Sequence, residues 1–125
     1  HHLSTPDAII CGDFNVVPDV LDSWQGTLAE GTVFHTQDER NRLQAIMDLG
    51  LTDIFRDRFP DEQQFSWWDY RGGAFHRGQG LRIDFILGNQ SICSRTRNIM
   101  IDRDYRKKKE KLTASDHAPV IVELD

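Results

Sequence analysis

The sequence predicts an α/β fold in a single domain. The chain has 125 residues, which is enough for one domain with a modest core. Short apolar runs typical of strands alternate with a well-capped helix, and no regular series of strand–helix–strand units is visible. A layered arrangement of helices and sheet fits this mixture best.

Composition indicates a soluble globular protein and excludes a membrane partner. Hydrophobic residues make up 38% of the chain and charged residues 28%, and no apolar run approaches the ~20 residues that a membrane helix needs. The first residues lack a secretory signal pattern, and we give His1 and His2 no function because such a pair is typical of an expression tag. Cys11 and Cys93 show no metal-ligand spacing, which favours a reduced, cytoplasmic setting.

The first predicted element is a short strand. Residues 8–11 form a continuous apolar run that is typical of a strand buried on both faces. The strand delivers Asp13 and Asn15 at its C-terminal end. Residues 16–35, which contain glycine and proline breakers, are expected to be irregular.

A helix follows with strong start and stop signals. Thr36 and Glu39 fit a capping box, in which each side chain bonds the other residue's backbone N–H. Apolar residues then recur at roughly helical spacing until Gly50, which is a natural stop. Residues 51–59 suggest a short second helix.

The second half of the chain is mostly strand and loop. Residues 65–70 are aromatic and strand-like, whereas residues 71–80 hold four glycines and indicate a mobile surface loop. Strands are predicted at residues 81–87, 98–101 and 118–124. In the first of these, alternation places Arg82 and Asp84 on one face.

Polar residues interrupt or adjoin apolar runs at three separate places. Burying charge without a partner costs several kcal/mol, so these groups must meet one another, a metal or a ligand. Three carboxylates, an amide, a guanidinium and an imidazole are the groups needed to hydrolyse a phosphodiester with a divalent metal. The residues are Asp13, Asn15, Arg82, Asp84, Asp116 and His117.

Each of these places also has a structural interpretation. Asp13 and Asn15 are common in turns. Arg82 and Asp84 suit an internal salt bridge, while Asp84 also suits a hydrogen bond that fixes the tautomer of His117. Both hold together if Arg82 pairs elsewhere. An adjacent Asp–His pair by itself is ordinary surface chemistry.

Aromatic and basic segments flank these groups. Alternation implies that one of Trp67 and Trp68 faces inward and the other outward, where it can stack on a base. The net charge of −5 argues against attraction of nucleic acid to the whole surface. The basic run at residues 103–111 is either a solvated loop or a site for a polyphosphate backbone.

Four ordered motifs, at residues 12–15, 65–71, 80–84 and 115–120, resemble those in the C-terminal half of the exonuclease III family of DNA-repair nucleases. This family lies within the endonuclease/exonuclease/phosphatase superfamily. Each motif is weak alone, but the ordered set is highly specific. The aromatic and Leu-Arg-Ile-Asp segments favour exonuclease III over the inositol phosphatases and sphingomyelinases, which share Ser-Asp-His.

The resemblance implies half of a four-layer α/β-sandwich, with one mixed sheet and helices on one face. It implies 3′–5′ exonuclease and abasic-site endonuclease activity on DNA with Mg²⁺ or Mn²⁺. The implied catalytic residues are Asp13, Asn15, Asp84 and His117, with Asp116 as a metal ligand. The implied DNA contacts are Trp67, Arg71, Arg82, Lys109 and Lys111.

The resemblance also implies that residues 1–125 are a fragment that is inactive alone. Family members are about twice as long, and their N-terminal half supplies a second sheet and a metal-binding glutamate. A lone half would expose an apolar sheet face, so we expect self-association, as a homodimer for example. The alternatives are a non-catalytic fragment that binds DNA weakly and a phosphoesterase acting on lipid or inositol phosphate.

Overall fold

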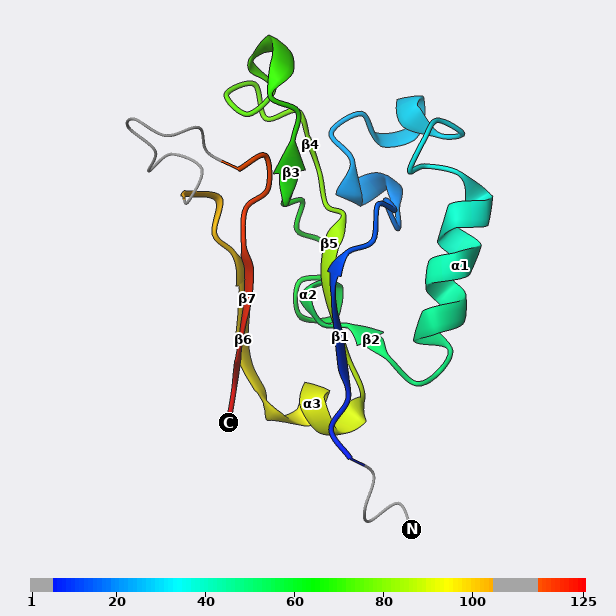
Figure 1. The fold of residues 1–125 in the computed structure, drawn as a ribbon, viewed down its shortest axis with the longest axis vertical. Helices are drawn as coiled ribbons and strands as arrows, with labels where there is room; N and C mark the ends of the chain where they lie inside the picture. The colour runs from blue at the N-terminus through cyan, green and yellow to red at the C-terminus, as the bar shows by residue number, and fades with distance from the viewer. Residues whose placement is uncertain (1–5, 105–114) are drawn as a thin grey trace.

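The computed structural model describes residues 6–104 and 115–125. These residues form short strands flanked by three α-helices, with α1 on one side and the pair β6 and β7 on the other (Figure 1). The predicted α/β class is confirmed. Among the described strands, every pairing is antiparallel and the strands form three small sheets, which differs from the one mixed sheet that we expected.

The central sheet has the strand order β1-β5-β2. Its strands are β1 (Ile9–Asp13), β5 (Asp84–Gly88) and β2 (Thr52–Asp53). β1 was predicted to be buried on both faces, but all five of its residues are exposed. The prediction was wrong because β1 is an edge strand that β5 covers on one side only.

Two further strand pairs complete the sheet structure. β3 (Trp67–Trp68) pairs with β4 (Gly80–Leu81). β6 (Thr96–Ile101) pairs with β7 (Val120–Leu124), the C-terminal strand, drawn in red in Figure 1.

The strand predicted over residues 81–87 is broken into two. β4 ends at Leu81 and β5 begins at Asp84. Between them, the backbone N–H of Arg82 donates to the carbonyl of Asp22 at 2.9 Å, and that of Ile83 donates to the hydroxyl of Ser66 at 3.1 Å. These N–H groups therefore bond other segments and not a neighbouring strand.

The helix predicted from a capping box is confirmed as α1 (Gln37–Met47). The Thr36 hydroxyl accepts the Glu39 backbone N–H at 3.2 Å, and the Glu39 carboxylate accepts the Thr36 N–H at 3.0 Å. Gly50 follows with a φ of +101°, a backbone conformation that favours glycine. No helix among the described residues is long and apolar enough to cross a membrane.

The other helices are shorter. α2 (Ile54–Arg58), within the predicted segment 51–59, begins after Asp53, whose side chain caps it. α3 (Gln90–Arg95) was not predicted, although its cap Asn89 is a standard start signal. Single 3-10 turns occur at η2 (Val20–Asp22), η3 (Gly26–Ala29) and η4 (Arg71–Gly73).

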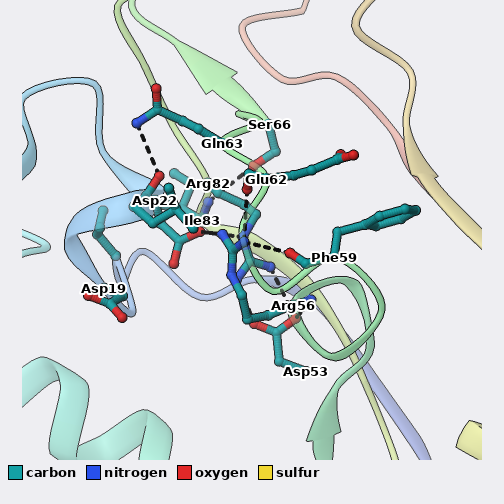
Figure 2. Close-up of polar contacts among 12 residues, drawn as sticks. Asp19, Asp22, Asp53, Arg56, Phe59, Glu62, Gln63, Ser66, Arg82 and Ile83 are labelled. Carbon is teal, nitrogen blue, oxygen red and sulfur yellow. Dashed lines mark hydrogen bonds and ion pairs between the residues drawn. The ribbon is translucent and has the colours of Figure 1, made fainter.

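The core contains a buried ionic cluster around Arg82 (Figure 2). Arg82 is 1% exposed, and its guanidinium donates to Asp22 at 2.7 Å and to Asp53 at 2.6 and 3.1 Å. Asp22 also accepts from Arg56, and the ring of Phe85 lies 4.8 Å from the guanidinium carbon of Arg82. Burial opposes the charge of Arg82, but the two aspartates outweigh it and raise its pKa.

This cluster corrects the expectation that Arg82 contacts DNA. Its side chain is enclosed by α2, η2 and the central sheet, so it presents no surface to a ligand. The internal salt bridge was the right interpretation, although the partners are Asp22 and Asp53 and not Asp84.

We expect Arg82→Met to destabilise the fold by about 3–5 kcal/mol, because it leaves two buried carboxylates without their partner. Urea unfolding of both proteins measures the difference. The matched control is Arg97→Met, which removes an exposed pair with Asp125 and should cost less than about 1 kcal/mol. Equal effects of the two substitutions would contradict the proposed importance of the buried cluster.

Candidate active site

The pairing of β1 with β5 places the first two candidate residues side by side. Asp13, the last residue of β1, lies directly opposite Asp84, the first residue of β5. Both residues therefore sit at the same end of the sheet. Their carboxylates meet there because the strands run antiparallel and end at that point.

His117 joins this pair from the other end of the chain. Its backbone forms an isolated β-bridge with Trp67. Its Nδ1 lies 2.8 Å from a carboxylate oxygen of Asp84, which is a hydrogen bond. Its Nε2 lies 3.6 Å from Asp13 and 3.8 Å from Asp116. The predicted Asp84–His117 contact is thus present in the structure.

Asp116 and His117 are adjacent in sequence but their side chains reach one site. The Asp116 carboxylate accepts a hydrogen bond from the indole N–H of Trp67 at 3.0 Å. Its backbone carbonyl accepts the Trp68 N–H at 3.0 Å. These two bonds anchor the segment before β7 to the aromatic strand β3, so that Asp116 lies beside the imidazole.

Asn15 reaches the site through its backbone. Its φ is +52°, and its N–H donates to the Asp13 carboxylate at 2.9 Å. The segment is therefore a tight turn, as the structural interpretation held, and the turn also orients Asp13. The Asn15 side chain is exposed at this end of the sheet.

The electrostatics of the site centre on Asp84. Burial raises the pKa of Asp84, hydrogen bonds with His117 and Ser66 lower it, and the nearby Asp13 raises it again, with a net rise. A buried carboxylate beside a second carboxylate holds a cationic partner more strongly than it would in water. Protonation of His117 is thereby favoured when a reaction supplies a proton.

A groove of about 530 Å³ opens next to these groups. Its lining combines Asp84 and His117 with the apolar ends of β1, β5 and β7, including Ile86 and Val120. The groove therefore gives a ligand access to the imidazole.

The arrangement fits a divalent metal ion. Asp13, Asp84 and His117 each offer a ligand atom, and these atoms lie within 4.8 Å of one another. Carboxylate oxygens are the ligands that Mg²⁺ and Mn²⁺ prefer. Asp116, the predicted ligand, lies at the edge of this group through its contact with His117.

The expected DNA contacts fall in different places. Trp67 is half-buried and packs against Leu81 and Ile83 while its indole N–H faces Asp116. Arg71 is 88% exposed and is held by Asp69 through two hydrogen bonds from its guanidinium, at 2.7 and 3.1 Å. The predictions for Lys109 and Lys111 lie outside the described residues.

Two residues of this region were not found from the sequence. Ser66 is fully buried and its hydroxyl binds the backbone of Ile83 and Asp84. Arg103, the first residue of the basic run, stacks on Phe75 at 4.3 Å instead of facing solvent alone. A small polar residue inside the aromatic run was the only sequence signal for Ser66.

Comparison with known proteins identifies the family. The sequence profile of the Endonuclease/Exonuclease/phosphatase family matches residues 2–117. The chain belongs to this family. It is 37% identical to exodeoxyribonuclease III of Haemophilus influenzae and 32% identical to an exodeoxyribonuclease of Bacillus subtilis, over 99% and 90% of its own length. It spans 48% and 42% of those two proteins, which is about half of their length.

Solved structures of the family share the fold. The 3′ phosphatase NExo from Neisseria, bound to a product DNA hairpin, superposes with a TM-score of 0.90 at 33% identity and covers 99% of this chain, which spans 47% of it. An AP endonuclease from Archaeoglobus fulgidus gives a TM-score of 0.87 at 32% identity, covering 95% of this chain and 46% of its own. The resemblance to exonuclease III proteins is confirmed.

The raised pKa of Asp84 predicts a pH dependence of stability. Below pH 3.8, its ordinary pKa, the carboxyl is protonated in both states. Above it, the unfolded chain loses this proton first, so this residue lowers stability as pH rises toward the native pKa. Asp84→Asn should lose that downward component in urea unfolding between pH 3.5 and about 7. The exposed Asp57→Asn should keep it, and identical pH profiles for both variants would contradict the assignment.

The Asp69–Arg71 pair predicts an effect on DNA binding. Hydrogen bonds from Arg71 lower the pKa of Asp69 to about 2, so the pair persists at every pH used for binding assays. Asp69→Asn should release Arg71 toward DNA and strengthen duplex binding roughly two- to five-fold at low salt. Fluorescence anisotropy measures this change. Unchanged or weaker binding would contradict a role for Arg71 in contacting DNA.

Proposed function

We propose that this chain carries part of the active site of a metal-dependent DNA-repair nuclease, which hydrolyses phosphodiesters at abasic sites and at 3′ ends. The observation that carries the proposal is the meeting of Asp13, Asp84 and His117 at the mouth of a groove. The printed activities of the relatives and the DNA bound to one structural neighbour support DNA as the substrate.

The imidazole of His117 is the group that moves a proton or contacts the phosphate. Because Nδ1 faces the Asp84 carboxylate at 2.8 Å, that nitrogen carries the hydrogen and Nε2 is left as an acceptor in the neutral ring. Nε2 can take a proton from water or, once charged, donate to a phosphate oxygen. Asp84 stabilises the charged ring in either role.

The remaining residues orient the reacting groups. Asp13, 3.6 Å from Nε2, is placed to position the attacking water or to protonate the leaving oxygen. Asn15 holds Asp13 through its backbone N–H and is proposed to contact the phosphate with its side chain. Asp116, with Asp13 nearby, would hold Mg²⁺ or Mn²⁺, which when bound supplies positive charge against the phosphate oxygens.

DNA contacts are proposed for the surface next to this site. Trp67 would line the pocket for an abasic sugar, since its ring lies beside His117 and among apolar residues. Arg71, and Lys109 and Lys111 by their charge, would hold the phosphate backbone.

We further propose that an N-terminal half of similar size completes the site and supplies a metal-binding glutamate. The exposure of the whole of β1, together with the groove between β1 and β7, supports a missing partner on this face. Without that half, the same face would favour association of two copies, which light scattering detects. Free Cys11 and Cys93 are consistent with work inside the cell.

The decisive test is cleavage of a duplex with one abasic site in the presence of Mg²⁺, with this chain alone and with the N-terminal half supplied. His117→Ala should lower the rate by at least about 100-fold, because it removes the acid–base group. EDTA should also abolish cleavage.

Two other outcomes would point elsewhere. If the chain binds the duplex weakly but cleaves it in neither form, the non-catalytic alternative holds. Turnover of inositol phosphate or of a phospholipid with none of DNA would instead favour the phosphoesterase alternative.

A further inference from the structure

Ser66 connects the two segments that carry the Asp84–His117 pair. It is completely buried, in the aromatic segment that leads into β3. Its backbone carbonyl accepts the N–H of Ala118, the residue after His117, at 2.8 Å. Its hydroxyl oxygen accepts the N–H of Ile83 and that of Asp84, both at 3.1 Å. Ser66 therefore bonds next to each member of the pair (Figure 2 shows it beside Ile83 and the Arg82 cluster).

The hydroxyl proton of Ser66 has a restricted choice of acceptor. A serine hydroxyl offers one donor and two acceptor lone pairs. The two backbone N–H groups occupy both lone pairs, which leaves only the O–H to be satisfied. A buried donor needs a partner, and the Asp84 carboxylate, on the residue whose own N–H binds this oxygen, is an acceptor of full charge within the same site.

We propose that Ser66 is a positioning residue, which donates its hydroxyl proton to the Asp84 carboxylate and thereby holds that carboxylate against Nδ1 of His117. The proposal rests on the role of His117 in the proposed function. The downward effect of a Ser66 hydrogen bond on the pKa of Asp84 agrees with it.

Several features argue that the position is built for this bond. Two of the three interactions on the hydroxyl come from the break between β4 and β5, so the same oxygen that ends the strand also sets the start of the catalytic residue. The backbone bond to Ala118 fixes His117 from the opposite side. A side chain without a hydroxyl would leave two backbone N–H groups and one carboxylate lone pair unmatched in a buried place.

The test compares Ser66→Thr with Ser66→Val, which have nearly the same shape and differ in the hydroxyl. The readout is the proton NMR resonance of the His117 ring N–H, which a hydrogen bond to a carboxylate moves far downfield and protects from exchange. His117→Asn assigns the resonance by its loss. Ser94→Ala, an exposed serine far from this site in sequence, is the control.

The expected result is a protected downfield resonance in the wild type, in Ser66→Thr and in Ser94→Ala, and its loss or broadening in Ser66→Val. In the cleavage assay, Ser66→Val should lower kcat by about ten-fold or more relative to Ser66→Thr with KM nearly unchanged, because small displacements of a catalytic group are costly.

Other results decide against one proposal or the other. A wild-type resonance retained by Ser66→Val would overturn the positioning role. So would a valine variant that is unfolded by circular dichroism where the threonine variant is folded, since the hydroxyl would then serve folding. If the resonances behave as expected but the wild type with its N-terminal half cleaves no DNA, Ser66 keeps its positioning role and the proposed function fails.

Discussion

The hydrogen bond between Nδ1 of His117 and the Asp84 carboxylate is the contact on which the site depends. It joins two segments that are 33 residues apart, at 2.8 Å. A single ring nitrogen held in this way determines which nitrogen is left for chemistry. Every other group at the site, including Asp13 and Asp116, is placed with respect to that imidazole.

The rest of the fold supports this contact by fixing β5. The buried cluster of Arg82, Asp22 and Asp53 fastens the residues just before β5 to η2 and α2. Buried ion pairs contribute little net stability, because desolvation offsets attraction, but breaking one is costly. Such a cluster therefore specifies one arrangement of the chain more than it strengthens it. The register of β1 on β5 then sets Asp13 beside Asp84.

Local signals in the sequence predicted local features well. The capping box of Thr36 and Glu39 gave the start of α1, because both of its bonds lie within four residues. Polar residues inside apolar runs indicated the site, since buried polar groups need partners. By contrast, nothing near Arg82 in sequence indicates Asp22 or Asp53, which lie 60 and 29 residues away. The exposure of β1 was also invisible, because an apolar run does not reveal which neighbours cover it.

The most direct test of the central claim is the tautomer of His117, measured by nitrogen-15 NMR of the ring in labelled protein at a pH where the imidazole is neutral. The account predicts hydrogen on Nδ1 and none on Nε2, which leaves the acceptor facing Asp13. Hydrogen on Nε2, or free exchange between both tautomers, would show that Asp84 does not hold the ring and would contradict the proposed site.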